Sequence, residues 1–195
     1  MGSPLVDSRE WRRETKGTGY LISTRTPCFD LDWLNAAYGT EEMFWAKPLP
    51  RDHLATMLAH SLALGLYEVH PRMPEAKSEG SPSSPRTPSP TLQDEPDEQL
   101  KQIGIARLIT DHVTFAYLCD VYIDPTHRSL GLGQWLIGCV RELLQGIPAM
   151  TRSLLLTSSA VARRFYEREL GFWDIAEEGG HPICMTRKAY EVEKK

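Results

Sequence analysis

The 195-residue sequence has no uninterrupted apolar run of about 18 residues, only four cysteines and no strong excess of either charge. Without such a run we expect no membrane-spanning helix, and because residues 1–19 contain no apolar h-region we expect no secretory signal. The cysteines form no C-x-x-C pair and the six histidines show no ligand spacing, so we expect no disulfide framework and no metal. A net charge of −4 argues against a nucleic-acid partner. These absences favour a cytoplasmic protein, with the nucleus as an open alternative.

One segment, residues 71–98, differs from the rest in composition. It holds seven of the 14 prolines, five serines, no aromatic residue, and six acidic against three basic groups. Too little apolar surface is available to offset the entropy of ordering, so we expect a disordered insertion that joins two strands. Four of its residues precede proline and are candidate phosphorylation sites: Ser81, Ser84, Thr87 and Ser89. We expect a single domain over residues 20–190 around this insertion, with a flexible lead-in at 1–19 and a tail at 191–195.

Elsewhere the apolar residues alternate between strand and helix periods. They predict strands at residues 20–23, 66–69, 103–109, 115–123, 153–157, 172–175 and 183–188. They predict helices from Asp30 through Tyr38, from Pro50 to the region of Gly65, from Leu132 to the region of Gly146, and from Ala160 to Leu170. This order indicates an α+β fold with a mixed, largely antiparallel central sheet flanked by helices.

A glycine motif lies between strand 115–123 and the helix that follows it. Arg128, Gly131 and Gly133 have the spacing R-x-x-G-x-G. One G-x-G is expected by chance in a chain of this length, but here an apolar strand precedes it and an amphipathic helix follows. Glycines let a ligand approach free N–H groups at a helix start, where the helix dipole attracts anions. The dinucleotide-binding pattern G-x-G-x-x-G is not met, because Leu136 stands at the position of its third glycine. We therefore expect a ligand that carries a pyrophosphate but is not such a dinucleotide.

The segment DVYIDPTHRSLGLGQWLI resembles the acetyl-CoA motif of the Gcn5-related N-acetyltransferase (GNAT) superfamily. LISTRTPCFDLDWLNAAY, FWAKPLPRDHL and GLYEV are similar to a group of small bacterial and fungal members with mostly unassigned substrates. The resemblance covers most of residues 20–188 and implies a GNAT-like fold with acetyl-CoA as co-substrate. It places pantetheine between strands 115–123 and 153–157. The residues it implies for cofactor binding are Val121, Tyr122, Ile123, Arg128, Ser129, Leu130, Gly131, Leu132 and Gly133.

Acetyl transfer needs a neutral amine, yet a lysine-like amine with a pKa of about 10.4 is mostly protonated at pH 7. Asp120 is the best-placed carboxylate to accept that proton, although a strand aspartate can equally pair with a neighbour or meet solvent. By resemblance, the N–H of Val121 or Tyr122 stabilises the oxyanion and Tyr166 protonates the thiolate of CoA. Tyr166 is followed by E-R-E-L-G-F, one residue longer than is usual in the superfamily. It therefore either faces the thiol or packs as a core aromatic.

The acceptor side is predicted from the same resemblance. Phe44 and Trp45 match an aromatic pair that lines it in relatives, where they could hold a cationic amine or pack under the loop. Ser158 is expected to cap a helix or contact pantetheine, and Cys119 to be a small buried residue, because transfer in the superfamily is generally direct. We therefore predict an N-acetyltransferase that acts on a small-molecule primary amine, as a monomer or homodimer. The alternatives are a non-catalytic acyl-CoA-binding module and a protein lysine or N-terminal acetyltransferase.

Overall fold

The computed structural model describes residues 8–71, 98–157, 159–179 and 184–185. The chain divides into two compact units, Met1–Leu156 and Thr157–Lys195. The first unit holds one six-stranded sheet whose strands lie in chain order and pair antiparallel, except for the parallel pair β5–β6. The strands are β1 (Glu10–Thr15), β2 (Thr18–Ser23), β3 (Leu62–Pro71), β4 (Glu98–Thr110), β5 (Phe115–Ile123) and β6 (Arg152–Leu155). The predicted fold class is confirmed.

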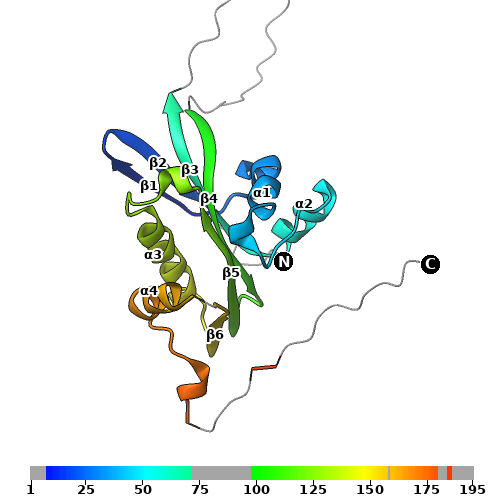
Figure 1. Ribbon diagram of the computed structural model, residues 1–195, viewed down its shortest axis with the longest axis vertical. Helices are drawn as coiled ribbons and strands as arrows, with labels where there is room; N and C mark the ends of the chain where they lie inside the picture. Colours follow the sequence, from blue (N-terminus) through cyan, green and yellow to red (C-terminus); the bar gives the residue numbers. More distant parts are fainter. Residues whose placement is uncertain (1–7, 72–97, 158, 180–183, 186–195) are drawn as a thin grey trace, which may run out of the picture. The chain divides into compact units, whose positions relative to one another are not determined.

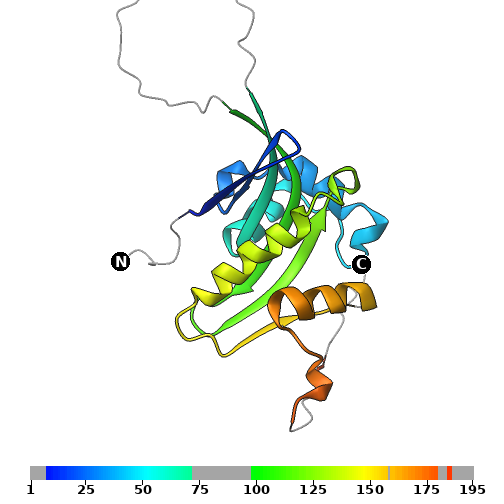
Figure 2. The same ribbon diagram turned by 90° about the vertical axis from the view of Figure 1, so that its left-hand side faces the viewer.

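Helices cover both faces of this sheet. α1 (Leu31–Tyr38) and α2 (Arg51–Ala59) lie on one face and α3 (Leu132–Gln145) on the other (Figure 1 and Figure 2). As predicted, Asp30 caps α1 by accepting from the amides of Asp32 and Trp33. The prediction for α2 was wrong at its end, because Leu62 to Gly65 pair with β4 and extend β3 instead of the helix. The apolar residues at 62–65 fit both the helix period and the strand period, and their hydrogen-bonded pairing with β4 makes them part of a strand.

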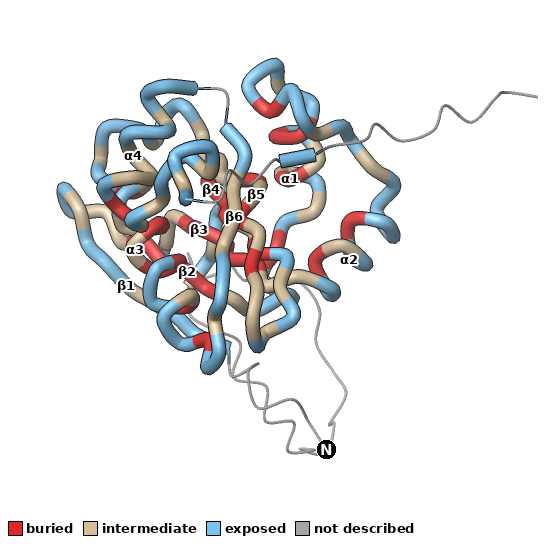
Figure 3. Tube along the Cα trace, turned by 90° about the horizontal axis from the view of Figure 1, so that it is seen from below, coloured by how far each residue is buried: buried red, intermediate tan, exposed pale blue. Residues whose placement is uncertain are grey.

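The core has two parts, one on each face of the sheet. Between α1, α2 and the sheet, Leu34, Met43, Leu54 and Ile105 are fully buried. On the opposite face, α3 buries the apolar stripe that its sequence predicts. Its buried residues are Leu132, Leu136, Ile137, Cys139, Val140 and Leu143. Figure 3 shows buried positions concentrated along the central strands and the inner sides of these helices.

Strand β1 lies inside the segment that was predicted to be a flexible lead-in. It pairs with β2 through a tight turn in which Lys16 and Gly17 have φ of 53° and 79°. Two consecutive left-handed residues match the right-handed twist of a two-stranded hairpin. The prediction was wrong because E-W-R-R-E-T has a single apolar side chain and lacks the alternation of a half-buried strand. Residues 1–7 lie outside the described part of the chain.

The predicted insertion does join two neighbouring antiparallel strands. The β3–β4 ladder runs as far as the pair Pro71 and Glu98, where the two strands end. Residues 72–97, with the four candidate phosphorylation sites, lie outside the described residues.

The second unit contains α4 (Ala160–Leu170), which has the predicted bounds. Ser159 caps it by accepting from the amide of Ala162, and Gly171, with a φ of 70°, ends it. The strand predicted at 172–175 is wrong: these residues lead into a 3-10 helix, Ile175–Glu177, capped by the Asp174 side chain. Arg163 pairs with Asp174 and Glu177 and so stabilises this arrangement. The strand predicted at 183–188 falls mostly outside the described residues, as does the tail at 191–195. Among the described helices, none has the length and apolarity needed to cross a membrane.

Candidate functional site

Strand β6 pairs with only the first half of β5, because β6 itself ends at Leu155. The β5–β6 ladder ends at Leu118 and Leu155, so residues 119–123 have no strand partner on that side within the described residues. On its other side β5 contains a bulge, because Asp120 and Val121 both lie opposite Ala106 of β4. Asp120 has a φ of 50°, in the left-handed region that few non-glycine residues adopt. The predicted binding residues Val121, Tyr122 and Ile123 thus lie on a bulged, partly unpaired segment.

The glycine turn follows directly and ends at the start of α3. Ser129 and Gly131 have φ of 66° and 73°, and no side chain caps the helix. Gly133 has helical φ, and a Cβ added there would lie 3.6 Å from Ile123 Cδ1, an ordinary contact. Neither backbone nor packing therefore requires glycine at 133, although glycine inside a helix costs about 1 kcal/mol relative to alanine. Free amides beside an empty Cβ position suit a ligand that approaches the main chain closely.

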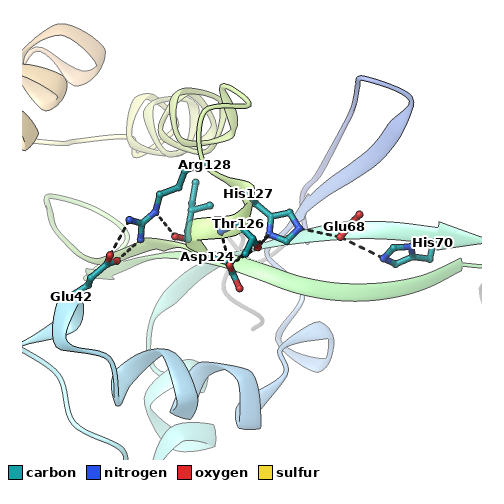
Figure 4. A network of polar contacts seen from close by, with 8 residues as sticks. Glu42, Glu68, His70, Asp124, Thr126, His127 and Arg128 are labelled. Carbon is teal, nitrogen blue, oxygen red and sulfur yellow. Dashed lines mark hydrogen bonds and ion pairs between the residues drawn. The ribbon is translucent and has the colours of Figure 1, made fainter.

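Arg128, the first residue of the motif, is held by other residues of the protein. Its Nε donates to the carbonyl of Ile123 at 2.9 Å, and its two terminal nitrogens donate to the carboxylate of Glu42 (Figure 4). The guanidinium also lies 5.6 Å from the centre of the Tyr122 ring. The hydrogen bonds from Arg128 lower the pKa of Glu42 below its ordinary value. Arg128 therefore ties the glycine turn to the loop that contains Glu42, and its charge is largely neutralised.

A polar network fixes the short turn that precedes Arg128. Asp124 accepts hydrogen bonds from the amide and hydroxyl of Thr126 at 2.9 and 2.7 Å (Figure 4). His127 Nε2 lies 3.2 Å from the Glu68 carboxylate on β3, and His70 lies on the other side of that carboxylate. The hydrogen bond from Thr126 lowers the pKa of Asp124. This network attaches the approach to the glycine turn to the centre of the sheet.

A second cation, Arg13, lies beside the glycine turn, and the sequence analysis missed it. Alternate residues of the β1 segment reach along α3: Arg9 near Gly146, Trp11 bonded to Glu142 at 2.8 Å, and Arg13 near Gly131. A Cβ added to Gly131 would lie 3.9 and 4.0 Å from the two terminal nitrogens of Arg13. Within the described residues no carboxylate pairs with Arg13, so its charge is available at this helix start. Arg13 can be placed on the same face as Trp11 only when the segment is known to be a strand, because alternate residues of a strand point to the same side.

Asp120, 6% exposed, is already paired. Its Oδ2 accepts hydrogen bonds from Arg107 Nε at 2.7 Å and the Tyr38 hydroxyl at 2.9 Å, and its Oδ1 accepts one from Trp45 Nε1 at 3.2 Å. Burial, followed by the charge of Asp120, raises the pKa of Tyr38 well above its ordinary value. Burial lowers the pKa of Arg107, but the neighbouring carboxylate outweighs it, so the net shift is upward. Of the readings that the sequence left open, the structure shows pairing with neighbours.

The two predicted acceptor-side aromatics lie together in the loop before α2. Phe44 and Trp45 are 72% and 52% exposed, and their rings meet edge to face with centres 5.1 Å apart. The indole of Trp45 is bonded to Asp120, so this aromatic pair is attached to the β5 bulge. The structure thus brings Trp45, Asp120, Arg128 and the glycine turn into one connected set of contacts.

Comparisons with known proteins establish the family of the chain. A sequence model of the acetyltransferase (GNAT) family matches residues 64–172, more than half of the chain. A Gibberella zeae protein, FG08082, that is named as an acetyltransferase is 37% identical over 161 residues, 83% of each chain. The protein belongs to the GNAT acetyltransferase family. Soybean (Glycine max) TAP1, named a histone acetyltransferase, is 38% identical over 79 residues, which are 40% of this chain and 32% of TAP1.

Solved GNAT structures share the fold. A Xanthomonas campestris pv. campestris protein assigned to the GNAT family has a TM-score of 0.59 and 23% identity, and the match covers 90% of this chain and 97% of that one. A Staphylococcus aureus protein, SA2161, has a TM-score of 0.51 and 15% identity over 93% and 99% of the two chains. At these identities the likeness concerns the fold alone.

The remaining predicted residues of this GNAT protein have distinct positions. Leu132 is 1% exposed, so its side chain belongs to the core and only its backbone faces the turn, while Ser129 is exposed and Leu130 is half-buried. Tyr166 lies on α4 in the second unit, where burial raises its pKa to about 12. Its catalytic role stays a prediction. Ser158 lies outside the described residues, and its neighbour Ser159 is the helix cap.

Three further features of this GNAT protein concern the reactivity of Cys119, a surface hollow and metal binding. Burial raises the pKa of the Cys119 thiol to about 12, which makes it a poor nucleophile. A hollow of about 370 Å³ lies between the end of α3 and the strand ends at Leu62 and Thr110, and contains none of the predicted site residues. Among the described residues, no cluster of histidine, cysteine, aspartate and glutamate could hold a metal ion.

Proposed function

We propose that this GNAT protein transfers an acetyl group directly from acetyl-CoA to a primary amine of a small molecule. One observation carries the proposal: the segment of β5 that extends beyond β6 leads, through the turn at Pro125–His127, to an uncapped helix start with a left-handed glycine. A strand edge without a strand partner suits an extended pantetheine arm, and the helix start suits its pyrophosphate. The two features follow one another along the chain, in the order that the parts of CoA require.

The residues at the turn fit the charge and shape of that pyrophosphate. The main-chain amides between Arg128 and Gly133 would hold it, with the missing side chains of Gly131 and Gly133 allowing close approach. Arg13 would supply the uncompensated positive charge, since Arg128 is neutralised by Glu42. Acetyl-CoA, when bound, supplies a thioester whose carbonyl carbon is open to attack by an amine and whose thiolate can leave.

The chain's own groups would then stabilise charge and deliver a proton. The amide of Val121 or Tyr122, at the bulge, is the proposed donor to the carbonyl oxygen, where negative charge develops. Tyr166 is the proposed proton donor to the leaving thiolate. Its raised pKa of about 12 keeps the phenol protonated at any physiological pH. Cys119 stays a neutral thiol, which supports direct transfer without an acetylated enzyme.

The acceptor site is proposed at the exposed pair Phe44 and Trp45. Aromatic faces attract cations, so an amine that arrives protonated would be concentrated there, and it would lose its proton to solvent water before it attacks the thioester. The nearby carboxylates Glu41 and Glu42 favour the same charge, although Glu42 is already paired.

An assay of free-thiol release from acetyl-CoA tests the function. The acceptor panel is spermidine, tyramine, glucosamine, free lysine and a lysine-containing peptide. We expect release with at least one small amine and a product heavier by one acetyl group. Binding of CoA in calorimetry without release for any acceptor would favour the non-catalytic module. A preference for the peptide over every small amine would favour a protein acetyltransferase, in line with the name of the soybean relative.

A further inference from the structure

We infer that Asp120 is a positioning residue that fixes the indole of Trp45 at the acceptor site, and that it does not take the proton of the amine. The inference deepens the proposed function and rests on it. It replaces the role that the sequence suggested for this carboxylate, and it gives roles to Arg107 and Tyr38, which no motif had singled out.

The first argument is that the acceptor positions of Asp120 are largely filled. Three donors from three elements meet its two oxygens: Arg107 of β4, Tyr38 of α1 and Trp45 of the loop before α2. The side chain is 6% exposed, so water does not compete for these oxygens. A general base needs an oxygen within hydrogen-bond reach of the proton it removes, and here the nearest donors belong to the protein.

The second argument concerns charge. Arg107 is 12% exposed and forms a buried ion pair with Asp120. Loss of the carboxylate would leave that guanidinium without a counter-charge in a largely desolvated position, which is strongly unfavourable. The other titratable groups that face the carboxylate are Tyr38 and Cys119. The pKa of each is raised, mainly by burial, so both stay neutral. The carboxylate of Asp120 therefore serves as the counter-charge of Arg107.

The third argument concerns what the carboxylate holds. Trp45 is half-exposed and Phe44 is more so, and the two rings in contact form a contiguous exposed apolar surface of the kind that binding sites use. The Trp45 indole has one polar atom, and that atom is bonded to Asp120. The bond anchors one edge of the ring to the β5 bulge and leaves a face for the acceptor. Glu42, in the same loop, is bonded to Arg128, so the loop is tied to β5 and to the glycine turn.

Nuclear magnetic resonance tests the tether without any need for turnover. In protein labelled with nitrogen-15, the indole N–H signal of Trp45 is assigned by its loss in Trp45→Phe. We expect this signal to resist exchange with water and to move in Asp120→Asn, with the other indole signals unchanged. Asp32→Asn is the matched control, because Asp32 is an exposed aspartate that pairs with an arginine. A Trp45 signal that exchanges freely, or that is the same in Asp120→Asn, would overturn the inference.

Steady-state kinetics with the best amine of the panel tests the role. We expect Asp120→Asn and Trp45→Phe each to raise the KM for the amine about tenfold, with kcat within about threefold of wild type. The double variant should match the larger single effect, because both changes break one bond. The pH profile of kcat/KM should keep the same acidic limb in Asp120→Asn. Loss of a true base would instead lower kcat by about 10²- to 10⁴-fold and remove that limb.

Two outcomes separate this inference from the proposed function. If Asp120→Asn fails to fold because Arg107 is left unpaired, Trp45→Phe still decides, since an unchanged KM for the amine would overturn the tether. If the wild type releases no thiol with any amine but the Trp45 signal behaves as expected, the function fails and the tether stands.

Discussion

Replacing Arg13 tests whether the N-terminal hairpin contributes to CoA binding. A guanidinium about 5 Å from a phosphate charge gains about 3 kcal/mol at an effective dielectric constant of about 20. Because Arg13 is exposed, solvent and salt reduce this to about 1 kcal/mol, or about a fivefold change in Kd. We expect Arg13→Met to weaken CoA binding by about that factor in calorimetry at low salt, and by less at high salt.

Arg12→Met is the matched control for this measurement. Arg12 is the neighbouring residue on the other face of β1, where it pairs with Glu98 at 2.8 Å, away from the turn. Its removal should leave the Kd for CoA unchanged. Acetyl-pantetheine, which lacks the phosphates, should serve wild type and Arg13→Met equally well as an acetyl donor. Equal Kd values for the two variants, or a loss that salt does not reduce, would refute the electrostatic argument.

Three further predictions concern the turn and the chemistry. Gly131→Ala places a Cβ on a residue with a φ of 73° and should lower the free energy of unfolding by about 1 to 2 kcal/mol in urea titration; unchanged stability would contradict the strain. Tyr166→Phe should lower kcat by about 10²-fold with an unchanged Kd for CoA, whereas an unchanged kcat would remove its assigned role. Cys119, with a pKa of about 12, should stay unlabelled by a thiolate-specific reagent at pH 8 while the exposed Cys184 reacts; rapid labelling of Cys119 would contradict its raised pKa.

The sequence predicts correctly the helices whose apolar residues follow a single period and whose ends are marked by capping residues or glycine. α1 starts after Asp30, α3 ends before Gly146 and α4 spans Ala160 to Leu170 because caps and glycines mark those boundaries. It failed where tertiary pairing decides. β1 has a single apolar side chain and exists through its hairpin with β2, while the Leu62 run joins β3 because β4 offers it a ladder.

The site was predictable only in part, for a similar reason. A glycine motif after a strand is a local pattern, so the turn at Gly131 and the neighbouring Arg128 could be found from the sequence alone. The partners of Asp120 could not, because they come from residues 38, 45 and 107, which the fold brings together. Arg13 was not predicted because strand β1 was not predicted. The neutralisation of Arg128 by Glu42 could not be predicted either, because the two residues are 86 positions apart in the sequence.

The end of the β3–β4 ladder has a consequence for engineering. Pro71 and Glu98 face each other across paired strands, so the fold fixes the separation of these two ends whatever length of chain connects them. Each doubling of such a connection costs only about 0.6 kcal/mol. A reporter domain grafted at this point, or a short turn spliced in its place, would leave the register of the whole sheet as it is.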